Sequence, residues 1–232
     1  MNLRGVDGCP AGWIAASLDL ETGRVTGEVF PPDAVTLLQN SSAAVTAIDI
    51  PIGLPSGTRR KVDGEARSLL GPRASSVFPA PDRSTLTANR YQQACAASLA
   101  ACGKSLSQQT YAILPKIRAV DALLQQDLGL RERVFEVHPE LCFFFWAGQK
   151  PMRYPKRSGF GFVERFELAR SAFGRAAEEI REAIPKSEAG DDDILDALAA
   201  LWTAQRIHSG GVVRLPLVEE LDECGLPMQM FA

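Results

Sequence analysis

The chain has 232 residues, a length that fits one domain with an insertion or two small domains. It is 46% hydrophobic and 23% charged, as in ordinary soluble globular proteins. No apolar run approaches the roughly 20 residues that a membrane-spanning helix needs, so no membrane role is expected. The formal net charge of −3 argues against strong binding of nucleic acid by charge alone.

The cysteines and the first residues of the sequence indicate the cellular location to expect. Residues 1–4 lead directly into a strand pattern, without the apolar segment of a signal peptide. The five cysteines are odd in number and include no Cys-x-x-Cys pair, which favours reduced thiols over disulfides or zinc. A cytoplasmic location is therefore expected. Cys9 is interpreted as a small buried residue, with a nucleophilic role as the alternative.

Short apolar runs separated by turn residues predict a mixed β-sheet. Five strands are expected, at residues 3–7, 13–19, 25–30, 44–50 and 134–138, with an edge strand at 212–215. The turn Glu21-Thr22-Gly23 joins the second and third strands as a hairpin. Three antiparallel strands, a helix and a returning strand predict that the fourth strand lies beside the first and parallel to it.

Helical patterns surround these strands and fill a long insertion after the fourth. Helices are expected at residues 34–39, 62–70, 88–101, 107–127, 139–148, 163–173, 176–183 and 192–207. Pro115 is expected to bend or restart the helix at 107–127. We predict one domain over residues 1–232, with a proline-rich helical and loop insertion at about 51–130 that faces a substrate.

Acidic residues interrupt the apolar patterns at separated points of the chain. Asp7, Asp49 and Glu136 end strands, and Asp193 and Asp196 stand three residues apart at the start of an apolar helix. The carboxyl ends of neighbouring parallel strands meet at one edge of a sheet, so these acids are expected to converge. Carboxylate oxygens favour hard cations, which predicts a Mg²⁺ or Mn²⁺ site. Helix capping at 191–193 and a loop cap at Asp49 are the alternatives.

Five motifs resemble one family. They are Gly5-Val6-Asp7-Gly8-Cys9 with Gly12-Trp13, Ile48-Asp49-Ile50-Pro51-Ile52-Gly53-Leu54, Gly71-Pro72-Arg73-Ala74-Ser75-Ser76-Val77-Phe78-Pro79-Ala80-Pro81, Glu136-Val137-His138-Pro139-Glu140, and Asp192-Asp193-Ile194-Leu195-Asp196-Ala197-Leu198. In this order, over roughly residues 1–205, the chain resembles the family called domain of unknown function 429. The resemblance implies a ribonuclease H-like fold, with its mixed five-stranded sheet, and a nuclease activity.

The pattern Asp-x-x-Asp-Ala-Leu-Ala at 193–199 is also similar to the final-helix motif of Holliday-junction resolvases. Those proteins place a glutamate on the fourth strand, where the candidate here is Asp49, and they are basic. Junction specificity therefore does not carry over.

The implied chemistry is phosphodiester hydrolysis by two divalent ions. In this hypothesis Asp7 bridges the ions, Asp49 and Glu136 complete one shell, and Asp193 and Asp196 complete the other. The substrate is a nucleic acid or a nucleotide.

Basic and polar residues of the middle region are candidates for substrate binding. Residues 59–165 hold 17 Lys and Arg against 9 Asp and Glu, charges that either form a positive rim or point in many directions. Arg73 and Arg83, on either side of Ser76, suit bidentate phosphate contacts. His138 either binds a phosphate or is structural. The weaker candidates are Lys116, Lys150, Lys156 and Arg157.

Two other classes of protein remain open. In a nucleotide-dependent kinase or ATPase of related fold, Gly8 and Gly12 would help Asp7 to cradle a phosphate. In a non-catalytic module, the acids would bind a nucleotide or a partner protein. The partly apolar tail at 224–232 either docks on a second subunit, as in a homodimer, or packs on its own domain.

Overall fold

The computed structural model describes residues 1–39 and 41–232. Its centre is a five-stranded sheet of order β3-β2-β1-β4-β5. The strands are β1 (Asn2–Cys9), β2 (Gly12–Asp19), β3 (Val25–Phe30), β4 (Ala43–Ile48) and β5 (Val134–Glu136). β1, β2 and β3 are antiparallel, whereas β4 pairs in parallel with both β1 and β5. The predicted mixed α/β sheet is therefore confirmed.

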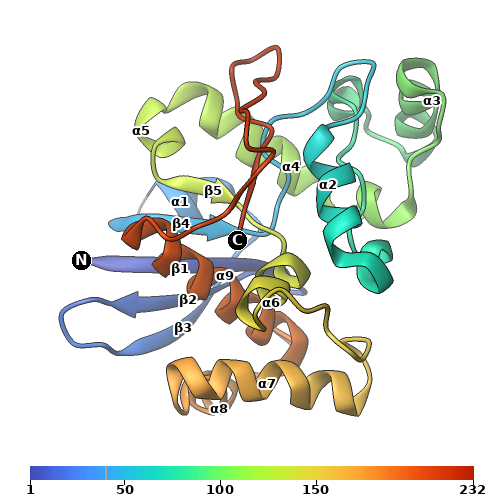
Figure 1. The fold of residues 1–232 in the computed structure, drawn as a ribbon. Helices are drawn as coiled ribbons and strands as arrows, with labels where there is room; N and C mark the ends of the chain where they lie inside the picture. The colour runs from blue at the N-terminus through green and yellow to red at the C-terminus, as the bar shows by residue number, and fades with distance from the viewer. Residues whose placement is uncertain (40) are drawn as a thin grey trace.

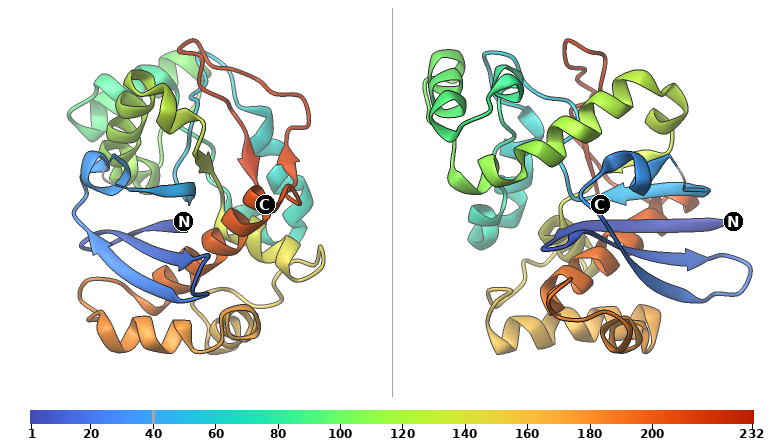
Figure 2. Two further views of the ribbon diagram at one scale, coloured as in Figure 1. Left: turned by 90° about the vertical axis from the view of Figure 1, so that its left-hand side faces the viewer. Right: turned by 180° about the vertical axis from the view of Figure 1, so that it is seen from behind.

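Helices cover both faces of this sheet (Figures 1 and 2). One face packs against α1 (Ala34–Leu38), α4 (Gln108–Gln126) and α5 (Leu128–Arg131). The other packs against α6 (Pro139–Trp146), α7 (Gly159–Phe173), α8 (Ala176–Ala183) and α9 (Asp191–Ser209). Successive side chains of a strand point to opposite faces, so Val6 and Ile48 belong to the first core and Leu3 and Ala47 to the second.

The insertion lies beyond the ends of β1 and β4 (Figure 1). It contains α2 (Lys61–Leu70), the 3₁₀ helices η1 (Gly71–Ser76) and η2 (Arg83–Thr87), and α3 (Tyr91–Cys102), and it leads into α4. Of the two effects expected of Pro115, the restart is not found, because α4 is one helix through this residue. Pro115 is exposed, so water can reach the carbonyl group that its missing N–H leaves without a donor.

Helix α9 lies directly on β1 because Gly5 leaves room for its backbone. A Cβ atom at Gly5 would lie 2.0 Å from the backbone nitrogen of Leu201 and 2.3 Å from the carbonyl oxygen of Ala197. The alanines along this side of α9 are fully buried against the sheet. This close approach fixes where the first turn of α9 meets the end of β1.

The C-terminal tail packs on its own chain. β6 (Arg214–Leu215), inside the predicted edge strand 212–215, pairs with β7 (Met230–Phe231) and not with the main sheet. Phe231 is buried, with its ring centroid 5.0 Å from that of Phe135. Across the described ranges 1–39 and 41–232, none of the helices combines the length and apolar character that a membrane span requires.

Candidate functional site

Asp7 and Asp49 stand beside each other at the ends of neighbouring parallel strands. Val6 of β1 pairs with Ile48 of β4, and the N–H of Asp49 donates to the carbonyl oxygen of Val6 at 2.9 Å. Each aspartate follows that pair by one residue, so both point to the face that α9 covers. The predicted meeting of these two acids is therefore found.

The first turns of α9 add two further carboxylates. Asp196 is buried at 5% exposure, and Asp193 is partly buried with one oxygen accepting the N–H of Gly190 at 2.8 Å. Burial raises the pKa of Asp7 well above its usual range, and the charges of Asp196 and Asp49 raise it further. Burial likewise raises the pKa of Asp49. These mutual effects place the four aspartates, hereafter the aspartate cluster, in one electrostatic environment.

Asp7 is the buried member of this cluster whose negative charge is least offset by basic groups. It is 7% exposed. Its side chain hydrogen-bonds to the carboxyl group of Asp49, and among the described residues no basic group lies within ion-pair distance of it. Two adjacent buried carboxylates without a base are costly, unless a shared proton or a cation offsets their charge. The site is therefore suited to a positively charged ligand.

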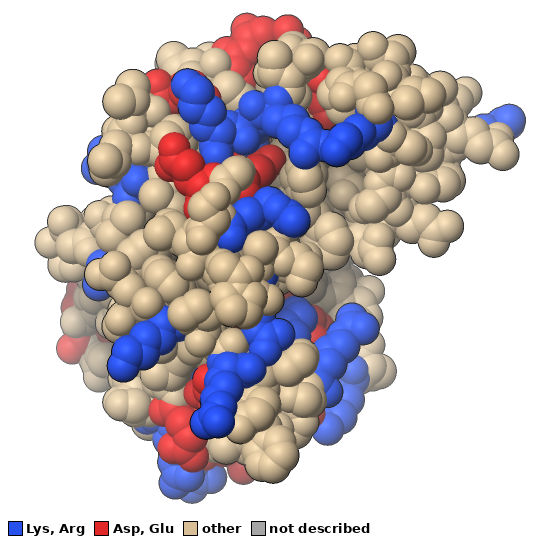
Figure 3. Space-filling view, turned by 45° about the vertical axis from the view of Figure 1, so that its right-hand side comes forward, with Lys and Arg blue, Asp and Glu red and all other residues tan. Residues whose placement is uncertain are grey.

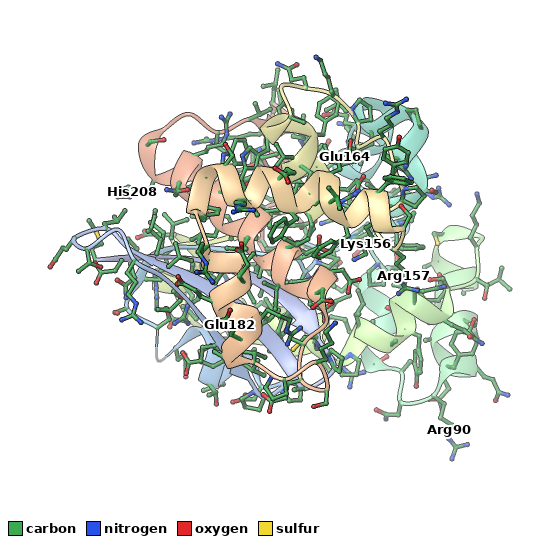
Figure 4. The ribbon with its side chains drawn as sticks, turned by 90° about the horizontal axis from the view of Figure 1, so that it is seen from below. Arg90, Lys156, Arg157, Glu164, Glu182 and His208 are labelled. Atoms are coloured by element: carbon green, nitrogen blue, oxygen red, sulfur yellow. The ribbon has the colours of Figure 1, made fainter. Side chains whose placement is uncertain are left out.

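Lys156 supplies the positive charge that the structure does contain. It lies in the segment between α6 and α7, beside the N-terminus of α7 and next to Arg157 (Figure 4). Its Nζ is 2.8 Å from Asp196 Oδ2 and 3.6 Å from Asp192 Oδ2. Burial lowers the pKa of Lys156, but the aspartates outweigh that effect and raise the pKa overall. Lys156 was a weaker candidate for binding a phosphate, and its pairing with Asp196 was not predicted.

Glu136 does not join the aspartate cluster. It pairs in register with Ile48, so it points to the α4 side of the sheet, opposite to Asp7 and Asp49. There the guanidinium group of Arg60 contacts both its oxygens, at 2.7 and 2.8 Å. The N–H of Ile52 donates to it at 2.6 Å. Burial raises the pKa of Glu136 to about 7, against the opposing effect of Arg60. Alternation along the strands was the signal that separates Glu136 from the other acids.

The two arginines predicted to contact phosphate have partners within the protein. Arg73 donates to the carbonyl oxygens of Met152 and Arg153, both at 2.8 Å. Arg83 forms a bidentate ion pair with Asp121 at 2.9 and 3.0 Å and a further contact with Asp222. Neither arginine contacts the aspartate cluster. Both connect segments of the insertion to other parts of the chain.

The remaining predicted side chains lie around the cluster. His138 is close enough to Asp49 to lower its pKa, and its Nε2 lies 3.2 Å from the carbonyl oxygen of Ser76. The hydroxyl of Ser76 donates to the carbonyl oxygen of Arg73, which is a local contact within η1. Lys116 donates to the carbonyl oxygen of Gly12 at 2.5 Å and lies over the Trp13 ring. Burial lowers the pKa of Lys116 overall, while the nearby Cys9 and Asp7 act in the opposite direction. The influence of Asp7 shows that Lys116 borders the aspartate cluster.

On the face shown in Figure 3, basic side chains do not form one continuous surface. There, Lys and Arg side chains stand in separate groups, with acidic side chains between some of them. Arg60, Arg73, Arg83 and Arg165 are paired with carboxylates or backbone carbonyls. Part of the charge excess of residues 59–165 therefore serves internal contacts of the protein.

The cluster is not arranged as a preformed metal centre. Within the described part of the chain, no three Asp, Glu, His or Cys side chains are placed to hold a metal ion together. One acid, Asp196, is engaged by Lys156 instead. Two concave pockets, of about 560 and 480 Å³, lie elsewhere, one between α2 and Leu215 and the other between the β2–β3 hairpin and α7 and α8.

Fold and site together describe an α/β protein with buried aspartates at the ends of two parallel strands. The chain belongs to the family described as protein of unknown function DUF429, whose model matches residues 5–220. The match contains all four members of the aspartate cluster as well as Lys156. No curated protein and no solved structure shows significant similarity to the chain.

Proposed function

We propose that this protein is a metal-dependent hydrolase of phosphodiester bonds, a nuclease in the broad sense. The aspartate cluster would hold Mg²⁺ or Mn²⁺, chiefly through Asp7, Asp49 and Asp196. The observation that carries the proposal is the contact between the carboxyl groups of Asp7 and Asp49, neither of which has an ion-pair partner among the described residues. Oxygen ligands are those that these two cations favour.

The residues differ in what they can contribute. A divalent ion held here would activate a water molecule and stabilise charge on the leaving oxygen. Asp7 and Asp49 are fixed by strand pairing, and Asp196 by the packing of α9 on β1. Asp193 uses one oxygen for the helix terminus, which leaves the other available. Glu136 has no part in this scheme because it faces the opposite side of the sheet.

The turn after β1 argues against the rival kinase or ATPase function. Cys9 still pairs with Gly12, so only two residues connect β1 to β2. In this tight hairpin the N–H of Ala11 donates to the carbonyl oxygen of Glu188 at 3.1 Å. A loop that cradles a phosphate needs several free backbone N–H groups, whereas of the two turn residues Pro10 has no N–H and that of Ala11 is engaged.

The first prediction concerns metal binding. Mn²⁺ or Mg²⁺ at one hundred times its Kd should stabilise the protein by about 2.7 kcal/mol, a rise of about 5–10 °C in Tm at this chain length. Asp7→Asn should abolish the rise. Asp191→Asn is the matched control, because Asp191 lies on the same helix but pairs with Arg181 and Lys186. Differential scanning fluorimetry measures both variants.

The second prediction concerns nuclease activity, and the oligonucleotides that are cleaved identify the class of substrate. A panel of labelled single- and double-stranded DNA and RNA oligonucleotides is incubated with Mn²⁺, and the wild type should cleave at least one whereas Asp7→Asn should not. A wild type that is neither stabilised by Mn²⁺ nor active on the panel contradicts the proposal. Stabilisation by ATP with Mg²⁺ far above that by Mg²⁺ alone would favour the kinase-like alternative instead.

A further inference from the structure

The ammonium group of Lys156 closes one side of the aspartate cluster. Among residues 1–39 and 41–232, Lys156 is the basic residue that forms an ion pair with a member of the cluster, through Asp196. Lys116 borders the other side but donates to the carbonyl oxygen of Gly12. One ammonium therefore faces four carboxylates, and the buried Asp7, which hydrogen-bonds to Asp49, has no basic group at ion-pair distance in the described part of the chain.

The backbone that carries Lys156 is fixed, whereas its side chain is not. Arg73 holds the carbonyl groups of Met152 and Arg153, and the carboxylate of Glu164 accepts the N–H groups of Arg153 and Tyr154. The Lys156 side chain is 40% exposed, and its hydrogen bond is to Asp196. Rotation about the flexible lysine stem can move the ammonium into solvent while the loop stays in place.

From this geometry we propose that Lys156 is an internal counter-ion of the aspartate cluster, one that a divalent cation displaces. The inference rests on the metal-dependent function proposed above. A cation bound through Asp196 competes with the ammonium for the same carboxylate and repels it. Lys156 therefore weakens metal binding and stabilises the metal-free protein, because it leaves Asp196 with a partner when no ion is bound.

The test uses three variants at or beside this position. Lys156→Gln removes the charge but keeps most of the stem, Lys156→Arg retains the charge, and Arg157→Gln removes a neighbouring exposed charge. Isothermal titration calorimetry with Mn²⁺ should show a Kd about tenfold lower for Lys156→Gln than for the wild type. Lys156→Arg and Arg157→Gln should stay close to the wild-type Kd.

Stability without metal gives a second readout that does not depend on activity. Metal-free Lys156→Gln should melt about 5 °C below the wild type, since Asp196 loses its partner. Saturating Mn²⁺ should remove that difference. In an Asp196→Asn background, Lys156→Gln should cause a much smaller fall in Tm, because the carboxylate nearest to the ammonium is absent and the longer contact with Asp192 remains.

The outcomes separate this inference from the function on which it rests. If the wild type binds Mn²⁺ and Lys156→Gln binds it equally or more weakly, Lys156 is not a displaced counter-ion, although the metal site stands. If neither protein binds Mn²⁺, both proposals are overturned. If Lys156→Gln binds Mn²⁺ and the wild type does not, Lys156 is a counter-ion that excludes the metal ion, which supports the inference.

Discussion

At the scale of single residues, Asp7 differs from most other buried acids of this protein because no base lies at ion-pair distance from it in the described structure. Asp7 and Asp196 are both largely buried, but only Asp196 has an ion-pair partner in the described structure. Other buried acids differ: Glu136 pairs with Arg60 and Glu140 with Arg165. In a buried ion pair the attraction offsets the cost of desolvation, whereas an ionised Asp7 beside Asp49 has no base to offset that cost. Such a cost is typical of residues kept for binding or catalysis.

The pH dependence of stability follows from the pKa of Asp7. Burial, Asp196 and Asp49 raise that pKa in the folded protein, so the folded state holds a proton that the unfolded chain releases from about pH 4 upward. Metal-free wild type should therefore lose stability as the pH rises above this value. Asp7→Asn, which cannot ionise, should escape that loss.

Urea denaturation at pH 5 and pH 8 without metal measures this effect. The stability of Asp7→Asn relative to the wild type should increase at the higher pH, by about 1–3 kcal/mol. The effect of Asp191→Asn, at an ion-paired surface site, should change much less over this range. An equal difference at both pH values would show that Asp7 is already compensated.

At the scale of elements, two packing relations build the site. β4 beside β1 brings Asp49 next to Asp7, and α9 on β1 brings Asp196 over both. The strand alternation that joins Asp7 to Asp49 also sends Glu136 to the other face. A shift of one residue in the register of β5 would turn Glu136 toward the face of Asp7 and Asp49. The strand register therefore determines which acids belong to the site.

The contact between α9 and β1 predicts a large effect at Gly5. Gly5→Ala places a methyl group within 2.0 Å of the α9 backbone, which must move away. We expect a loss of about 3 kcal/mol in the free energy of unfolding, together with weaker Mn²⁺ binding, as Asp196 moves with the helix. Urea denaturation measures the first effect and calorimetry the second.

Gly64→Ala is the matched control, because Gly64 is an exposed residue of α2 and a methyl group added there would meet no atom within 4 Å. That change should be neutral or stabilising by up to about 1 kcal/mol. Similar effects at Gly5 and Gly64 would mean that α9 does not approach β1 as closely as described.

At the scale of the whole molecule, buried ion pairs tie the insertion to the sheet. Arg60 contacts Glu136 of β5, Asp63 of α2 and the backbone carbonyl of Ile52. α4, which completes the insertion, packs on the same face of the sheet through Ile117 and Val120. The predicted single domain stays a prediction, but these contacts supply the physical basis for it.

We therefore expect one cooperative unfolding transition. Trp13, Trp146 and Trp202 all lie outside the insertion, whereas α2, α3 and α4 contribute strongly to the helical circular dichroism signal. Tryptophan fluorescence and far-ultraviolet circular dichroism should give the same midpoint in a urea titration. A circular dichroism transition at lower urea than the fluorescence transition would show that the insertion unfolds by itself.

Much of this architecture follows from local sequence patterns. Short apolar runs and turn residues predicted all five strands of the main sheet, and the acidic start and apolar surface of the helix expected at 192–207 predicted α9 almost to its ends. Parallel pairing of the first and fourth strands predicted the meeting of Asp7 and Asp49. These features depend on residues a few positions apart, or on connection rules that any chain obeys, so one sequence is sufficient to predict them.

Only the tertiary structure decided which charges meet. Arg73 and Arg83 suited a phosphate by residue type, yet their partners are backbone carbonyls near residue 152 and carboxylates at 121 and 222. Lys156 reaches Asp196 from 40 residues away, and Arg60 reaches Glu136 from 76. Ion pairs form between side chains that packing brings within about 4 Å, and no local pattern encodes that distance. The sequence by itself determined the elements and the acids, while strand register and helix packing decided which acids form the site.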